Sequence, residues 1–427
     1  MADLSYVKRN LVRYRWIVFA VLTTAYFFVY FQRMAVGVVG IDIVEDVGGS
    51  IGVLSAVYFW TYTIMQIPSG LLADHLGPRK ASAIFLSVAA AGSLITFCAD
   101  SFLVAVIGKI MIAAGMAVVY IPLMKVISVW FGKKDFPQLA GIVIAVGNVG
   151  AIAASAPLEV LAEAFGWRDV FLVLGTVTAL LAVSCMLFVR DHPHDKGFPG
   201  VEELGTDDDR SDATDVKLPM IQGLKMVAAG GRKFWPLALA YFFVYGSIMV
   251  FQGTWAKIYF DNIYDFVMSV VWFITAIGVG KIIGTVVIGV FSGRGVIRSK
   301  RRAMLFGTVC FSGIWAVIWL FSGDVDSYWF WMAVSFLFGF FGGFMTLSFT
   351  QVKECYPVAI SGTAVSAMNV FLFLGASVCI TMTEAVVGTS YTVESFGELW
   401  MIMFVMSVAA AILVFLSVEN NRSTQGN

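Results

Sequence analysis

Charged residues are scarce in this sequence. Only 13% of its 427 residues are Asp, Glu, Lys or Arg, and 59% are hydrophobic, whereas about a quarter of an ordinary soluble domain is charged. Helices that are apolar on every face need lipid, or a very large protein, around them. The composition therefore indicates an integral membrane protein. Because the net charge is zero, the total charge points to no nucleic-acid or other highly charged partner.

Groups for metal or nucleophilic chemistry are also few. The five cysteines occur singly, and no two have the spacing of metal ligands or of a disulfide framework. There are only three histidines, and no glycine-rich loop of the kind that cradles phosphates. The sequence therefore predicts no enzyme, no metal, no cofactor and no ATP-driven transport within this chain.

Long apolar runs account for most of the chain. A bilayer-spanning helix needs about 20 mainly apolar residues. Such runs cover residues 16–40, 51–73, 81–98, 102–131, 137–161, 168–189, 234–258, 267–291, 303–322, 328–352, 362–387 and 399–418. These twelve runs predict an all-α membrane protein with both chain ends on the same side.

The basic residues indicate which side that is. With the N-terminus assigned to the cytoplasm, 22 of the 28 Lys and Arg residues fall in cytoplasmic segments, and only Arg168 falls in an opposite loop. Cytoplasmic loops of membrane proteins carry an excess of basic residues. We therefore expect a multi-pass protein of the cell (inner) membrane with both termini in the cytoplasm.

The longest polar stretch divides the runs into two groups of six. It predicts a solvated linker at 191–233 between an N-terminal six-helix bundle at 1–190 and a C-terminal six-helix bundle at 234–427. Two short patterns recur between the halves: Tyr26-Phe-Phe-Val-Tyr30 as Tyr241-Phe-Phe-Val-Tyr245, and Gly141 with Asn148 as Gly362 with Asn369. Both matches pair a span with the sixth span after it, as two parallel repeats require.

The loop after the second span carries a recognisable signature. It reads Gly70-Leu-Leu-Ala-Asp74-His-Leu-Gly77-Pro-Arg79-Lys80 and resembles the major facilitator superfamily loop, Gly-x-x-x-Asp-x-x-Gly-x-Arg-Lys. The resemblance covers nearly the whole chain. It implies two pseudo-symmetric six-helix bundles, alternating access, and a conformational latch made by Gly70, Asp74, Gly77, Arg79 and Lys80. The corresponding stretch of the second half, 289–302, lacks the aspartate, which argues against a mirrored latch.

Other short stretches resemble particular branches of that superfamily. Tyr30-Phe-Gln-Arg33 and Gln66-Ile-Pro68-Ser-Gly70 are similar to the organic-anion and sugar-phosphate symporters and exchangers. The fifth span lacks the proline–glycine signature of drug/proton antiporters and reads Gly147-Asn148-Val-Gly150, which partly resembles nitrate carriers. Those carriers have paired arginines in the second and eighth spans, where this second span offers Tyr62 and Gln66.

Cations inside the predicted spans indicate what is bound. A cation at the bilayer centre costs at least about 2.5–3.5 kcal/mol, so such a residue usually faces a cavity and has a function. Arg33 lies deep in the first span on a stripe with Tyr26 and Tyr30, and Lys281 lies mid-way along the eighth, with Thr275 on its face. Lysine supplies a point charge where arginine would supply a bidentate fork. We expect both cations to bind an anion.

Three further lysines fall within spans. Lys125 lies near the cytoplasmic end of its span, where it either contacts substrate or snorkels to the interface. Lys109 and Lys257 lie nearer the outer ends of theirs. We expect both of these to snorkel.

Polar and aromatic side chains complete the predicted binding site. They are Tyr62 and Gln66 in the second span, Asn148 in the fifth, Tyr245, Gln252 and Trp255 in the seventh, and Asn369 in the eleventh. Phenols and amides can hydrogen-bond carboxylates and hydroxyls, although each asparagine can equally join two helices. Because the acidic residues lie towards span ends, the cavity should be net positive and attract anions.

These features predict a monomeric secondary transporter for a small organic anion, such as a carboxylate, sugar acid or phosphate ester. A dipeptide or nitrate transporter stays an alternative, and a drug or cation exporter fits less well because it would need a buried carboxylate. An anion can enter against an inside-negative potential together with a proton or in exchange for another anion. Glu159 and Glu384 are candidate proton relays, and we slightly favour symport.

Overall fold

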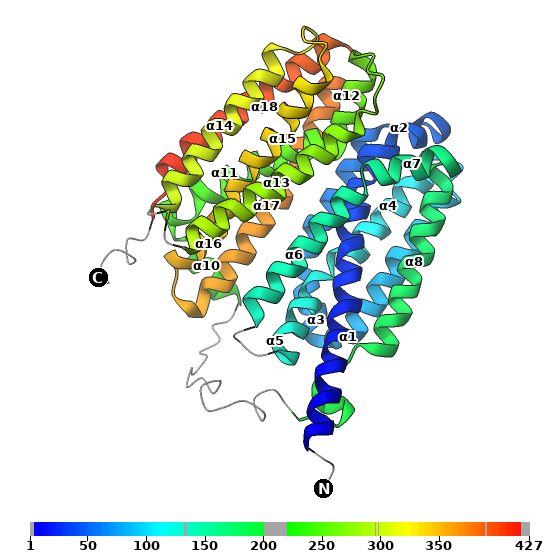
Figure 1. The fold of residues 1–427 in the computed structure, drawn as a ribbon, viewed down its shortest axis with the longest axis vertical. Coiled ribbons are helices and arrows are strands. Elements are labelled where there is room, and N and C mark those ends of the chain that lie inside the picture. The colour runs from blue at the N-terminus through cyan, green and yellow to red at the C-terminus, as the bar shows by residue number, and fades with distance from the viewer. Residues whose placement is uncertain are drawn as a thin grey trace. The chain divides into compact units, whose positions relative to one another are not determined.

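The computed structural model describes residues 4–131, 135–199, 220–294, 296–297, 299–388 and 391–419. These residues form helices and loops, with no β-strand among them. The chain divides into two compact units (Figure 1): the first comprises Met1–Gly49 and Thr61–Thr214, and the second comprises Ser50–Trp60 and Asp215–Asn427. The central part of the predicted linker, 200–219, lies outside the described residues.

The first unit contains most of the helices before the linker. They are α1 (Leu4–Met34), α2 (Val36–Val47), α3 (Ile51–Phe97), α4 (Phe102–Ala117), α5 (Tyr120–Trp130), α6 (Phe136–Ala153), α7 (Ala156–Phe165), α8 (Trp167–Phe188) and the 3-10 turn η1 (Pro193–Lys196). The first residues of α3 belong to the second unit. The other helices of this group lie wholly within the first.

The second unit contains the remaining helices. They are α10 (Met220–Ala228), η3 (Gly231–Lys233), α11 (Trp235–Val250), η4 (Phe251–Trp255), α12 (Ala256–Ile263), α13 (Val271–Gly293), α14 (Lys300–Leu320), α15 (Tyr328–Gly342), η5 (Gly343–Thr346), α16 (Leu347–Cys355), α17 (Val358–Val387) and α18 (Val393–Leu416). η4 is a π-helix, whereas η3 and η5 are 3-10 helices.

The described helices confirm a multi-pass membrane protein. Ten are long and apolar enough to cross a membrane, or eleven if α6 and α7, which meet at a bend of 42°, form one span. The 47-residue α3 covers two of the predicted spans, 51–73 and 81–98, with Gly77 between them at φ 76° and ψ 160°. Only glycine adopts that conformation readily. The count of twelve spans stays a prediction.

Five of the predicted spans are interrupted: the fifth bends by 42° between α6 and α7, and the other four hold equivalent places in the two halves. The first breaks between α1 and α2 and the fourth between α4 and α5, whereas the seventh continues through η4 and the tenth through η5. The residues that flank the three changes other than η4 keep helical φ and ψ. Because π-bulges are frequent at functional sites, η4 indicates where a binding site should be sought.

Each unit contains a closely packed helix pair of the same kind, α1 with α6 in the first and α11 with α17 in the second (Figure 1). A Cβ on Gly150 of α6 would overlap the carbonyl of Phe27 on α1, and a Cβ on Gly375 of α17 would overlap that of Phe242 on α11. Small residues allow membrane helices to approach this closely. The first and fifth spans thus pack as the seventh and eleventh do, in agreement with the repeat in the sequence.

Candidate functional site

Arg33 lies inside the first unit, in the last turn of α1. It is 4% exposed, and its Cζ lies 4.6 Å from the ring centroid of Tyr30 and 4.8 Å from that of Tyr62. Aromatic faces attract cations, and the C-terminal end of a helix carries partial negative charge. Both features stabilise the guanidinium. The structure therefore brings together three of the predicted site residues.

More polar side chains join this cluster. Gln66 makes a side-chain hydrogen bond with Tyr62, as the prediction of a shared site requires. Tyr26 packs against Tyr30 and against Tyr120 of α5, with centroid distances of 5.3 Å in both cases. Tyr120 was not predicted. The available signal was a phenol beside Pro122, in the middle of an otherwise apolar run.

Gln32 fixes the rotation of α1 that directs Arg33. Its Nε2 donates to Ser93 Oγ on α3 at 3.3 Å and to Thr178 Oγ1 on α8 at 3.5 Å, and all three residues are fully buried. A buried polar group that loses its partner carries a desolvation cost of about 1–3 kcal/mol. Rotation of α1 away from these partners is therefore unfavourable, which keeps Arg33 among the tyrosines.

Lys281 occupies a comparable setting in the second unit. It lies on α13, half-buried, with Nζ 5.2 Å from the ring centroid of Tyr245. Tyr245 in turn packs against Tyr241, at 6.2 Å between centroids, and against Phe373 of α17, at 5.9 Å. Two predicted site residues therefore meet here, and in each unit a cation within a predicted span lies against tyrosine.

The other predicted ligands are spread over neighbouring elements. Gln252 and Trp255 are buried in η4, where Trp255 Nε1 donates to Thr383 Oγ1 on α17 at 2.8 Å. Asn148 on α6 and Asn369 on α17 are both half-buried. Contact of these four side chains with substrate stays a prediction.

Lys125 lies in a different cluster from Arg33. Its Nζ donates to Asp74 Oδ1 at 3.0 Å and to the Ala73 carbonyl at 3.2 Å. The sequence left open whether Lys125 snorkels or meets substrate, and the structure pairs it with the aspartate of the signature loop. Its contact with substrate stays a prediction.

The rest of the signature loop is held by the last turn of α8 and by the residues that follow it. The Arg79 backbone N–H donates to Asp191 Oδ1 at 2.8 Å, and Arg79 Nε donates to the Met186 carbonyl at 2.9 Å. Asp191 thus caps the helical segment that begins after Gly77. A Cβ on Gly77 would collide with that carboxylate, so this position needs glycine for its space as well as its φ. Lys80 is exposed.

The second half has a charged cluster of its own, with carboxylates from unexpected places. The Lys300 backbone N–H and Ser299 Oγ both donate to the Glu419 carboxylate at 2.6 Å, just beyond α18. The Lys300 ammonium pairs with Glu354 of α16 at 2.7 Å. The stretch 289–302 does lack an aspartate, but the two glutamates supply negative charge to it.

Lys109 corrects one prediction. It is 0% exposed, with Nζ 4.6 Å from the ring centroid of Phe171 on α8, and no hydrogen-bond partner for Nζ occurs among the described residues. The expectation that it snorkels to the interface is therefore wrong. Lys257 Nζ pairs with Asp261 Oδ2 at 2.7 Å on the same helix. That Lys257 snorkels stays a prediction.

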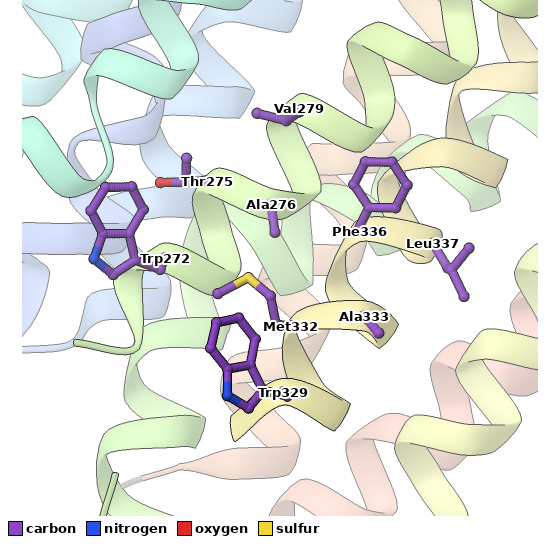
Figure 2. A pocket seen from close by; sticks show the side chains of 9 residues that line it. All are labelled: Trp272, Thr275, Ala276, Val279, Trp329, Met332, Ala333, Phe336 and Leu337. Carbon is purple, nitrogen blue, oxygen red and sulfur yellow. The ribbon is translucent and has the colours of Figure 1, made fainter. Parts of the chain in front are cut away.

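A groove of about 560 Å³ lies between α13 and α15. Figure 2 shows its nine lining side chains: Trp272, Thr275, Ala276, Val279, Trp329, Met332, Ala333, Phe336 and Leu337. The only hydroxyl among them, that of Thr275, donates to the Val271 carbonyl at 3.2 Å. An anion would find no charge here. Thr275 was predicted on the face of Lys281, but Lys281 is not among the lining residues.

Known proteins resemble this chain over most of its length. It is 23% identical over 309 residues to the probable sulfoacetate transporter SauU of Cupriavidus necator, covering 71% of this chain and 70% of that one. It is 23% identical over 435 residues to the hexuronate transporter of Escherichia coli K12, covering 96% of both. It is 21% identical over 397 residues to a probable hexose phosphate transport protein of Chlamydia trachomatis, covering 88% and 86%.

Solved structures share the fold. The D-xylose-proton symporter superposes with a TM-score of 0.75 at 14% identity, over 96% of this chain and 99% of the other. A bacterial homolog of the human lysosomal transporter Spinster, in an inward-facing and unoccupied conformation, gives 0.73 at 17% identity, over 94% and 96%.

The family itself follows from a direct match. The family model described as Major Facilitator Superfamily matches residues 22–380, which include the signature loop, Arg33 and Lys281. The all-α fold, the interrupted helices and the solved structures agree with that match. The chain is a transporter rather than an enzyme, and it belongs to the Major Facilitator Superfamily.

Proposed function

We propose that the chain is a secondary active transporter of a small organic anion, such as a carboxylate, a sugar acid or a phosphate ester. The observation that carries this proposal is Arg33, a cation buried in the first unit between Tyr30 and Tyr62. A guanidinium fork binds carboxylates and phosphates bidentately. The named substrates of the relatives, sulfoacetate, hexuronates and hexose phosphates, are all anions.

Arg33 and Lys281 both bind the anion in the course of alternating access. The tyrosine beside each cation supplies a hydroxyl for the oxygens of the substrate and a ring for its carbon skeleton. Gln66, Asn148, Gln252, Trp255 and Asn369 provide further hydrogen bonds. The buried setting strengthens these interactions, because two charges attract each other more strongly where the effective dielectric constant is lower than that of water.

The protein resides in the cell (inner) membrane with both termini in the cytoplasm, as the distribution of basic residues favours. Gly70, Asp74, Gly77, Arg79 and Lys80 serve as the latch of the transport cycle. The Asp74–Lys125 pair is the released arrangement of that latch, which Asp74 leaves when the latch closes.

Ligand binding tests the substrate class. Purified protein is warmed with panels of glucuronate, galactonate, sulfoacetate and glucose 6-phosphate, and with a dipeptide, nitrate and an organic cation for comparison. A ligand that binds only the folded state raises the melting temperature by mass action. We expect stabilisation by organic anions alone. Stabilisation by the cation, and by no anion, would reject the proposal.

Proteoliposomes test the coupling. We favour anion–proton symport, so an inward pH gradient should drive uptake of the stabilising anion into vesicles that hold no internal substrate. Uptake that occurs only into vesicles preloaded with an anion would establish exchange instead. Glu159→Gln and Glu384→Gln then ask whether either carboxylate relays the proton.

A further inference from the structure

Gly147 lies where α6 meets the tyrosines of the Arg33 cluster. It is buried, and a Cβ built on it would stand 3.0 Å from Tyr26 Cε1 and 3.0 Å from both Cδ2 and Cε2 of Tyr30. Such a distance is tighter than ordinary van der Waals contact, so the rings would have to give way by a few tenths of an ångström. The missing side chain therefore lets both rings lie against the backbone of α6.

The position of the Tyr30 ring matters because that ring also covers Arg33. Its centroid lies 4.6 Å from the guanidinium carbon and 5.3 Å from the Tyr26 centroid. Tyr26 is backed by Tyr120 at 5.3 Å. The two rings are thus held on several sides, and a methyl group on α6 would press Tyr30 away from α6 and change its place beside Arg33.

The second unit lacks this arrangement. Gly375 of α17 lies against the Phe242 carbonyl as Gly150 of α6 lies against that of Phe27, and Leu372, three residues before Gly375, is buried. A side chain therefore fills, in α17, the place that is left empty in α6. The recessed pair of rings is a feature of the first unit, which also holds Arg33, the cation that can bind an anion bidentately.

We propose that Gly147 sets the size of the anion accepted beside Arg33, by letting Tyr26 and Tyr30 recess far enough for a sugar-sized acid. This inference rests on the proposed function and deepens it, because it names sugar acids and sugar phosphates as the substrate class. The acidic group of the substrate binds the guanidinium, and its hydroxylated carbon skeleton lies against the recessed rings.

Three glycines of α6 provide a matched test in the full-length protein. Gly147→Ala fills the recess. Gly141→Ala is the silent control, because Gly141 is exposed and its Cβ would meet no atom within 4 Å. Gly150→Ala is the packing control, because its Cβ would overlap the Phe27 backbone carbonyl. Each variant is assayed for melting temperature and for the Kd of glucuronate and of the much smaller sulfoacetate.

Gly147→Ala should weaken glucuronate binding by about tenfold, since one methylene in a tight site discriminates at least that strongly, while sulfoacetate binding changes less than about twofold. Gly141→Ala should match the parent, and Gly150→Ala should lower the melting temperature without changing the ratio of the two Kd values. An unchanged ratio in Gly147→Ala overturns the inference. So does a parent protein that binds sulfoacetate but not glucuronate.

A second variant distinguishes an effect that passes through Tyr30 from a general folding defect. In Tyr30→Leu the ring that Gly147 contacts is gone, so adding Gly147→Ala should cause no further change in the ratio if the effect passes through Tyr30. Equal effects in both backgrounds would place the cause elsewhere in α6 and reject the mechanism. Failure of the parent to bind any anion would instead reject the proposed function.

Discussion

In both units a carboxylate just after the last membrane helix caps another helix, but the ion pair beside that cap has opposite polarity in the two units. In the first, Asp191 lies three residues beyond α8 and accepts the Arg79 N–H at 2.8 Å. In the second, Glu419 lies three residues beyond α18 and accepts the Lys300 N–H at 2.6 Å. Each carboxylate caps the N-terminal end of the third predicted span of its half, where helix dipoles favour negative charge.

A second contact accompanies each cap. Trp130 Nε1 at the end of α5 donates to the carbonyl of Arg190 at 3.0 Å, and Gln351 Nε2 on α16 donates to that of Val418 at 3.2 Å. Each of these carbonyls belongs to the residue before the capping carboxylate. The fourth span thus holds the same turn in both halves, with quite different side chains.

The charge pairs beside the caps have opposite polarity. In the first unit the acid, Asp74, is on the loop side and the base, Lys125, is on the fourth span. In the second, Lys300 supplies the base at the loop, and Glu354 supplies the acid from α16. Contacts that recur without similar residues are required by the fold. The ion pair, whose acid and base exchange places between the halves, is where the two halves can differ in function.

The largest expected effect distinguishes Arg33 from Lys281. Arg33→Lys keeps the charge but loses the fork, and we expect uptake at limiting substrate to fall roughly 10- to 100-fold, since a hydrogen bond to a charged group contributes about 1.5–3 kcal/mol. Lys281→Arg should change uptake much less. Radiolabelled uptake, corrected for the amount of protein in the membrane, measures both. Equal losses in the two variants would remove the distinction between the cations.

Next in size is the effect of the signature aspartate. Asp74→Asn should slow turnover by about tenfold, or ~1.4 kcal/mol, while leaving the Kd of the substrate unchanged, because Asp74 lies apart from the Arg33 cluster. Glu354→Gln, the matching change in the second unit, should leave turnover close to that of the parent. If Asp74→Asn instead raises the Kd of the substrate and leaves turnover unchanged, the latch assignment fails.

The caps should contribute to stability equally. Asp191→Asn and Glu419→Gln keep the shape but remove the negative charge at the helix N-terminus, and we expect each to cost about 1 kcal/mol. Melting of the purified protein in detergent measures the loss. Asp195→Asn, whose carboxylate accepts the N–H of the exposed His192, is the control. A loss from one cap and none from the other would show that the two turns are not equivalent.

Much of the fold was predictable because it depends on local hydropathy. The spans, the two halves and the signature loop all follow from runs and motifs in the sequence. The break at Ala35 did not, since 34–40 is apolar and favours a continuous helix to residue 40. Gly37 therefore lies on α2 rather than on α1.

The site was only partly predictable. Arg33, Tyr30 and Tyr62 could be singled out because a cation and phenols are conspicuous in apolar spans, and the structure places them together; their contact with substrate stays a prediction. Asp191 and Glu419 were missed because their partners lie 112 and 119 residues away, and nothing local links them. Lys109 was misjudged because depth along a span does not reveal which neighbours enclose a side chain.

The smallest expected effect concerns the stability of the two charge pairs. Lys125 and Asp74 have side chains 33% and 74% exposed, and Lys300 and Glu354 have side chains 18% and 47% exposed. Solvent-exposed pairs contribute about 0–1 kcal/mol, so a double-mutant cycle on either pair should give a coupling energy below ~1 kcal/mol. Exchanging the two charges, as Asp74→Lys with Lys125→Glu, should leave the melting temperature within a degree or two of the parent. The same exchange should slow turnover as much as Asp74→Asn does, because the latch requires a negative charge at position 74. Turnover equal to that of the parent would mean that the transport cycle requires the ion pair and not the aspartate itself. The inverted pair of the second unit would then be functionally equivalent to it.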